Sequence, residues 1–101
     1  MLPAKKVVVI TEKVLHDRLV EFSRSLGSVG YTSSLVNGSG YHGTRTGALS
    51  GHGDVFSNVK IEFIVPPEVA VKIVDGVMTH YFNDYAGIVY TEDVEVVRPK
   101  F

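Results

Sequence analysis

The segment Val7–Ile10 constrains the fold of this chain more than any other. It consists of four consecutive β-branched apolar residues, which favour a strand that is buried on both faces. After it in the sequence, four apolar residues recur at helical spacing: Leu15, Leu19, Phe22 and Leu26. Gly27 ends this pattern. We expect Thr11 to cap this helix and Glu12 to lie in its first turn. A buried strand followed by an amphipathic helix is therefore predicted.

The remaining elements follow from simpler patterns. The segment Gly30-Tyr31-Thr32 opens a second strand that runs to about Val36, and strict alternation over 59–65 predicts a third strand with one face in the core. Pro66-Pro67-Glu68 is a helix start, and Val69, Ile73 and Val77 form the apolar stripe of that helix. We expect a final pair of short strands, Ile88–Tyr90 and Val94–Val97, with a turn at Glu92-Asp93.

The order β-α-β-β-α-β predicts an α+β, ferredoxin-like fold over residues 1–101 as a single domain. The sheet has four antiparallel strands, with the first and third in the middle, and both helices lie on one face. An extra short strand follows at the C-terminal end. The other face of the sheet has no cover in a monomer and carries apolar residues, so self-association is expected.

Composition excludes several classes of function. The 101 residues carry a formal net charge of -1, so no basic excess is available to bind nucleic acid. The chain has no cysteine, which excludes disulfides, thiol catalysis and cysteine-bound zinc. The N-terminus does not have the layout of a signal peptide, and we expect a cytoplasmic protein.

The connection between the second and third strands, Gly38–Asn58, is far longer than a hairpin requires. It holds six of the ten glycines, and we expect a ligand or partner to order it. Backbone N–H groups of Gly38-Ser39-Gly40 can hold a small anion, and the Arg45 guanidinium can fold over that base. Lys60 is either a lysine of the sheet surface or a second phosphate contact.

The segment Tyr81–Tyr90 holds three of the five tyrosines around one acidic, glycine-containing turn. A core segment does not need three phenolic groups, because each buried hydroxyl requires a partner. We interpret the segment as one wall of a binding cleft. Asp84 either accepts a hydrogen bond from a ribose or caps the turn.

Catalytic and metal sites are not predicted. His42 and His52 lie ten residues apart without a fixed scaffold, which makes a poor metal site. No set of nucleophile, base and orienting group can be assembled, and phosphate-loop and dinucleotide glycine patterns are absent from the sequence. We expect a binding protein and not an enzyme.

Three stretches together resemble the PII-like signalling proteins, in the branch associated with bicarbonate transporters and carboxysomes. They are the segment 7–13, then Gly30-Tyr31-Thr32 with the glycines and arginine that follow, and above all Tyr81–Tyr90. The resemblance implies a homotrimer that binds adenine nucleotides between neighbouring subunits. It identifies the connection at about 38–58 as the T-loop, which changes state with ligand and contacts the target.

The resemblance also implies roles for individual residues. Thr32 would meet the adenine, Gly38 and Gly40 would line the loop base, and Arg45 would hold phosphate. The wall from Asp84 to Tyr90 would come from the adjacent subunit. The predicted nucleotide-binding set is Thr32, Asn37, Gly38, Gly40, Arg45, Lys60, Asp84, Tyr85, Ala86, Gly87, Ile88 and Tyr90.

His42 stands where some relatives have a second loop arginine, which favours ADP or AMP over ATP, with cyclic AMP as a further candidate. Bicarbonate is a candidate second ligand, held by Arg45 and Lys60. The expected partner is a bicarbonate transporter or carboxysome-associated protein, which would recruit the trimer to the inner membrane or carboxysome. Two alternatives remain open: a divalent-metal-binding trimer of the same fold, and a slow nucleotide phosphohydrolase.

Overall fold

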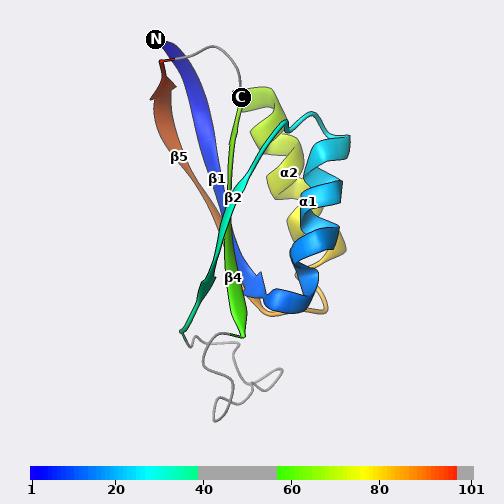
Figure 1. Ribbon diagram of the computed structural model, residues 1–101. Helices are drawn as coiled ribbons and strands as arrows, with labels where there is room; N and C mark the ends of the chain where they lie inside the picture. The colour runs from blue at the N-terminus through cyan, green and yellow to red at the C-terminus, as the bar shows by residue number, and fades with distance from the viewer. Residues whose placement is uncertain (39–56, 98–101) are drawn as a thin grey trace.

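The computed structural model describes residues 1–38 and 57–97, which form one four-stranded sheet with both helices on one face (Figure 1). Its elements are β1 (Leu2–Glu12), the 3-10 helix η1 (Lys13–Leu15), α1 (His16–Ser25), β2 (Thr32–Val36), β4 (Asn58–Val65), α2 (Pro67–His80) and β5 (Gly87–Val96). The strand order is β2-β4-β1-β5, and each pairing is antiparallel. The predicted ferredoxin-like arrangement is confirmed, with the first and third predicted strands in the middle.

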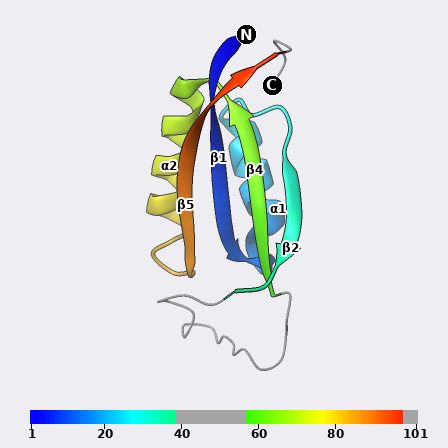
Figure 2. The same cartoon turned by 90° about the vertical axis from the view of Figure 1, so that its left-hand side faces the viewer.

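The core lies between the sheet and the helices. Along β4, every second residue is buried, as the alternation predicts. Val7 and Val9 of β1 lie opposite Phe63 and Ile61 of β4, and all four are at most 1% exposed. The other face of the sheet is not covered by either helix and is turned toward the viewer in Figure 2. This uncovered face, called the open face below, carries the alternate residues of the same strands.

Strand β1 is longer than predicted, and the predicted role of Thr11 is wrong. Thr11 lies within β1, where its hydroxyl donates to the carbonyl oxygen of Ala86 over 2.6 Å. Helix α1 begins only at His16, after the 3-10 turn, and has no side-chain cap. The hydroxyl that would have capped the helix is therefore used to hold a distant turn.

The predicted turn at Glu92-Asp93 is also wrong. Strand β5 runs without interruption from Gly87 to Val96, so the two predicted short strands are one. Glu92 and Asp93 lie opposite Lys6 and Lys5 of β1, and each forms an ion pair with its partner. Cross-strand pairs of opposite charge stabilise strand pairing at positions where acidic residues alone favour a turn. The described residues contain no extra C-terminal strand.

The predicted end of α1 and the predicted start of α2 hold. Gly27 follows α1 with a φ of 115°, the left-handed conformation that a glycine adopts readily, and Pro67 occupies the first turn of α2. Gly76 of α2 lies against the ring of Phe22 from α1. A Cβ at position 76 would overlap that ring, so this glycine allows the two helices to approach closely.

Candidate functional site

Most of the predicted site residues of β2, β4 and β5 share the open face of the sheet; Gly87, opposite Thr11, does not. Directly opposed residues of antiparallel strands project to the same side. One row across the sheet is Thr32, Glu62, Val8 and Tyr90, and the next is Ser34, Lys60, Ile10 and Ile88. Four predicted residues, Thr32, Lys60, Ile88 and Tyr90, therefore lie on one surface in two adjacent rows. Ile88 and Tyr90 are 55% and 40% exposed there.

The other predicted residues of the described part lie at one end of the sheet. Asn37 and Gly38 follow the end of β2 and are exposed, while Asp84, Tyr85 and Ala86 precede the start of β5. Strands β2 and β5 are the two edges, three strand spacings or about 14 Å apart. The loop base and the tyrosine-rich turn therefore lie at the same end of the sheet but at opposite edges. Gly40, Arg45, His42 and His52 lie outside the described residues.

Ala86 is held by two consecutive residues that the sequence patterns did not single out for this site. The Thr11 hydroxyl donates to the Ala86 carbonyl oxygen over 2.6 Å, and the Ala86 N–H donates to Glu12 Oε2 over 3.0 Å. Both backbone groups of one turn residue are thus bound by side chains from the end of β1. The pairing spans more than 70 positions in the chain, so no local pattern could reveal it.

Gly87 starts β5 in a space that only glycine fits. A Cβ at this position would lie 2.5 Å from Cζ of Phe82 and 2.8 Å from the carbonyl oxygen of Ile10. Real Cβ atoms do not approach backbone oxygen atoms this closely. The glycine in the tyrosine-rich turn therefore serves close packing of that turn on β1.

Tyr85 lies beside Arg18 of α1. The Arg18 guanidinium carbon is 5.7 Å from the centre of the tyrosine ring, and Nη2 lies 3.4 Å from the hydroxyl oxygen. A cation over an aromatic face is attracted by the ring quadrupole. Tyr85 also lines a hollow of about 470 Å³. That hollow is lined by Met78, Phe82, Asn83, Tyr85, Ala86, Gly87, Ile88 and Val89.

Charges of both signs alternate on the open face. Lys60 forms an ion pair with Glu62 over 3.5 Å, and Lys6 one with Glu92 over 3.1 Å. The hydrogen bond to Glu92, together with the charges of Glu92 and Glu62, raises the pKa of Lys6. Lys60 is thus a sheet-surface lysine whose ammonium group still has donors to offer a ligand.

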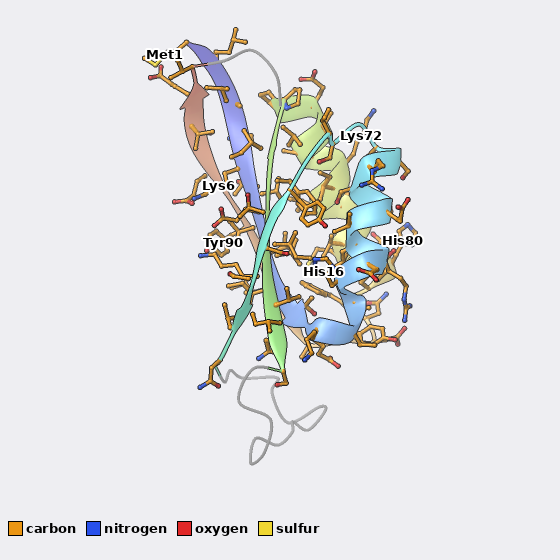
Figure 3. The ribbon with its side chains drawn as sticks, in the orientation of Figure 1. Met1, Lys6, His16, Lys72, His80 and Tyr90 are labelled. Atoms are coloured by element: carbon orange, nitrogen blue, oxygen red, sulfur yellow. The ribbon has the colours of Figure 1, made fainter. Side chains whose placement is uncertain are left out.

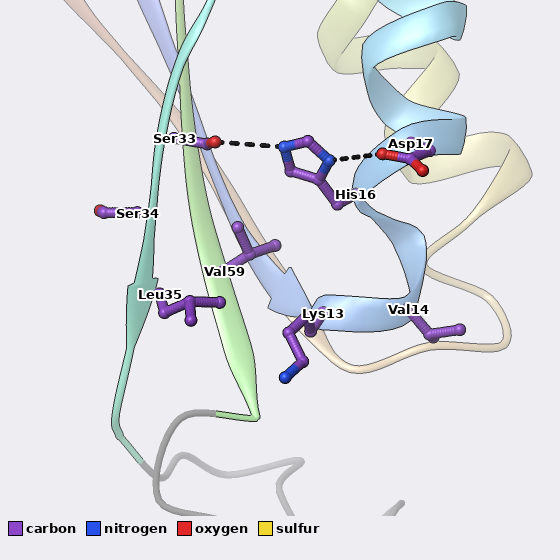
Figure 4. Close-up of a pocket in the computed structure, with 8 residues that line it drawn as sticks. All are labelled: Lys13, Val14, His16, Asp17, Ser33, Ser34, Leu35 and Val59. Carbon is purple, nitrogen blue, oxygen red and sulfur yellow. Dashed lines mark hydrogen bonds and ion pairs between the residues drawn. The ribbon is translucent and has the colours of Figure 1, made fainter.

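A second hollow, of about 590 Å³, lies between the start of α1 and the edge strand β2 (Figure 4). Within it, His16 Nδ1 lies 2.8 Å from Asp17 Oδ1 and His16 Nε2 lies 3.1 Å from Ser33 Oγ. Ser33, His16 and Asp17 thus form a serine–histidine–aspartate series of contacts that the sequence patterns did not reveal. The Asp17 side chain is fully exposed, however, whereas the orienting carboxylate of a hydrolytic triad is buried. This series of contacts alone therefore does not indicate catalysis.

Figure 3 shows that the other labelled histidine, His80, lies on the helical side of the sheet, away from the open face that carries Lys6 and Tyr90. Among residues 1–38 and 57–97, no three histidine or carboxylate side chains are grouped so that they could hold a metal ion. In the same part of the chain, no helix is long and apolar enough to cross a membrane.

Comparison with known proteins gives consistent results. Residues 4–100 match the sequence model of the family nitrogen regulatory protein P-II. A PII-like signalling protein of Thermus thermophilus is 35% identical, with 95% of this chain and 90% of that chain covered and a TM-score of 0.77. The PII-like protein CPII of Thiomonas intermedia, bound to ADP and bicarbonate, is 28% identical, with coverages of 96% and 91% and a TM-score of 0.80. A second CPII structure, bound to ADP, AMP and bicarbonate, is 25% identical, covers 97% of both chains and has a TM-score of 0.75.

Proposed function

The chain belongs to the nitrogen regulatory protein P-II family, and from this premise we propose that it is a trimeric sensor of adenine nucleotides. Signalling proteins of this family are non-enzymatic regulators, so nucleotide hydrolysis is not part of the proposal. Each nucleotide occupies a cleft between neighbouring subunits. We place the protein in the branch that responds to ADP, AMP and bicarbonate and regulates uptake or fixation of inorganic carbon.

One observation carries the proposal: Thr32, Lys60, Ile88 and Tyr90 share the open face of the sheet, in two adjacent rows. Two of these residues come from the loop-bearing strands β2 and β4, and two from the strand that follows the tyrosine-rich turn. The surface is partly apolar and partly charged, as a site for a base, a ribose and a phosphate requires. The likeness to CPII, which binds ADP and AMP, supports the choice of ligand.

The edge positions of β2 and β5 support a site that is shared between subunits. Within one chain, about 14 Å of sheet separates the two edges. We propose that in a trimer with a threefold axis the β2 edge of one subunit lies near the β5 edge of its neighbour. In this arrangement Thr32 contacts the adenine, and the segment Asp84–Tyr90 supplies the facing wall.

The phosphate end of the site uses the loop base. Asn37 and Gly38 are exposed at the end of β2, and Gly40 and Arg45 follow them in sequence. An arginine binds phosphate through two parallel hydrogen bonds. Arg45 is here the one loop arginine of the proposed site, because His42 stands where some relatives have a second one. We therefore propose that ADP and AMP bind more tightly than ATP, with cyclic AMP as a further ligand.

Bicarbonate is the proposed second ligand, held by Lys60 together with Arg45. Lys60 stands on the open face beside Glu62, with 3.5 Å between the charged atoms. An ammonium group has three donors, so Lys60 can keep this ion pair and still bind a small anion. CPII holds bicarbonate together with ADP, which supports the pairing of these two ligands.

We further propose that ligand binding selects the state of the connection 38–58 and so the surface presented to a protein partner. A ligand shifts such an equilibrium only through its different affinity for the two states. A bicarbonate transporter or a carboxysome-associated protein is the proposed partner.

Calorimetry tests the proposed function. AMP, ADP, ATP and cyclic AMP are each titrated into the wild-type protein, with and without bicarbonate. We expect saturable binding of ADP and AMP, weaker binding of ATP, and tighter ADP binding when bicarbonate is present. Lys60→Met should remove the bicarbonate effect, while Lys72→Met, on the exposed side of α2, should keep it. No binding of any nucleotide at millimolar concentration would overturn the proposal.

A further inference from the structure

Three consecutive residues, the last two of β1 and the first of η1, contact the tyrosine-rich turn and the end of the long connection. Thr11 and Glu12 bind Ala86 of the turn, and the N–H of Lys13 donates to the carbonyl oxygen of Ser57 over 2.9 Å. We propose that Glu12 is a positioning residue of the nucleotide cleft, and that the segment Thr11–Lys13 couples the cleft wall to Ser57 at the loop base. That nucleotide binding acts through this coupling rests on the function proposed above.

The two hydrogen bonds to Ala86 come from side chains on opposite faces of the sheet. Successive side chains of a strand project to opposite faces, so Thr11 lies on the helix side and Glu12 on the open side. Thr11 is only 2% exposed, and its hydroxyl bond to the Ala86 carbonyl is partly buried. The bond from the Ala86 N–H to the Glu12 carboxylate is charge-assisted and therefore stronger than a bond between neutral groups. Together the two bonds fix the orientations of the two peptide units that flank the Ala86 Cα atom.

The turn also has little space in which to move independently of β1. Gly87 lies directly opposite Thr11, and the Ile10 carbonyl oxygen would lie 2.8 Å from a Cβ at position 87. A ligand that displaces Ala86 or Gly87 must therefore displace the end of β1 as well. Tightly packed groups of this kind move together because no void exists to absorb the shift.

The same strand end is bound to the loop base on its other side. Glu12 lies opposite Asn58 in the β1–β4 register, and the Lys13 N–H is held by Ser57. Ser57 precedes Asn58, where β4 begins, so it ends the connection that starts after β2. A shift of Glu12 is thus passed to Ser57 through the one peptide unit that joins Glu12 to Lys13.

The first test compares Glu12→Ala with Glu12→Gln in calorimetry with ADP. Glutamine keeps an acceptor oxygen for the Ala86 N–H, whereas alanine leaves that N–H without it. We expect ADP affinity to fall by about tenfold in Glu12→Ala and by no more than about twofold in Glu12→Gln. Glu95→Ala removes an exposed carboxylate of β5 and is the control that keeps wild-type affinity. Equal losses in the alanine and glutamine variants would overturn the positioning role.

The second test follows amide exchange at Ala86 and Lys13 by NMR. In the wild type, saturating ADP should slow exchange at both amides. In Glu12→Ala at saturating ADP, the nucleotide is bound, but exchange at Lys13 should stay at the rate that this variant has without ligand. In Glu12→Gln, ADP should again slow exchange at Lys13. Slowed exchange at Lys13 in Glu12→Ala would overturn the coupling.

The ligand-free protein separates failure of this inference from failure of the proposed function. Without nucleotide, Glu12→Ala and Thr11→Val should each speed exchange at Ala86 and also at Lys13, whereas Thr11→Ser keeps the hydroxyl and the wild-type rates. A change confined to Ala86 would overturn the coupling even if ADP binds normally. Absence of ADP binding to the wild type would instead overturn the proposed function, and the ligand-free rates would still decide whether the turn and the loop base are coupled.

Discussion

Gly87 packs so closely on Ile10 that a Cβ at position 87 would lie 2.8 Å from the Ile10 carbonyl oxygen. The ring of Phe82 also approaches this position, with its Cζ atom 2.5 Å from where the Cβ would lie. The tyrosine-rich turn is thus fixed to β1 at the point where β5 begins, next to the residues that the proposed nucleotide site requires.

Replacement of Gly87 by alanine should therefore displace the turn. We expect a loss of stability of about 1–3 kcal/mol, as for other overpacked positions, and a fall in ADP affinity of at least about tenfold. Gly30→Ala is the matched control, because a Cβ there meets no atom within 4 Å. Urea unfolding and calorimetry of both variants provide the comparison, and equal behaviour of the two would contradict the packing argument.

Tyr85 should contribute to binding through its ring more than through its hydroxyl. Tyr85 lines the hollow of about 470 Å³, and its hydroxyl makes only a long contact of 3.4 Å to Arg18. Tyr85→Ala should weaken ADP binding by about fivefold or more, because stacking on an aromatic ring contributes about 1–3 kcal/mol per base. Tyr85→Phe should stay within about twofold of the wild type in the same titration. A larger loss in the phenylalanine variant would show that the hydroxyl is the binding group.

Gly76→Ala should destabilise the protein although alanine is the better helix former. The gain in helix propensity is about 1 kcal/mol, but the new Cβ overlaps the ring of Phe22. We expect a net loss of up to about 2 kcal/mol in urea unfolding, since overpacking costs about 1–3 kcal/mol and the propensity gain offsets about 1 kcal/mol of it. In a Phe22→Leu background, where the overlapping ring is absent, the Gly76→Ala substitution should cost less stability than it does in the wild type. A stabilised single variant would contradict the close approach of the two helices.

The Lys6–Glu92 pair predicts a pH dependence at alkaline pH. The hydrogen bond and charge of Glu92 raise the pKa of Lys6 in the folded state, with a smaller effect of Glu62. A raised pKa stabilises the fold fully below the unfolded-state pKa, and this contribution is lost as pH rises through the folded-state value. Glu92→Gln should therefore lower the Lys6 pKa, which NMR titration of its side-chain resonances measures. The stability difference between the variant and the wild type should shrink above the ordinary lysine pKa and stay constant near neutral pH.

Much of the fold could be predicted because local patterns carry it. The alternation over 59–65 predicted β4 and its buried face, and the Pro66-Pro67 start and Gly27 stop marked helix boundaries that the structure confirms. The turn at Glu92-Asp93 could not be excluded from local sequence. Its acidic residues favour a turn in isolation, and only the lysines opposite them on β1, more than 80 positions away, keep the strand continuous.

The candidate site was predicted in part for the same reason. The tyrosines and glycine of the segment Tyr81–Tyr90 are adjacent in sequence, so their concentration was visible. Thr11 and Glu12 contact Ala86 across more than 70 positions, and Thr11 instead matched a helix-cap pattern. Likewise, Ser33 and His16 come together only when β2 pairs at the edge of the sheet beside α1. The roles of Gly40 and Arg45, which lie outside the described residues, stay predictions.

Native mass spectrometry of the wild-type protein with ADP tests the central claim most directly, because it counts nucleotides on each oligomer. A site shared between neighbouring subunits requires that ADP be retained by trimers, with up to three molecules each, and not by monomers released from the same solution. We predict this distribution, and we predict that Gly87→Ala lowers ADP occupancy of the trimer while Gly30→Ala does not. Monomers that carry ADP, or trimers that carry none at millimolar ADP, would contradict the account.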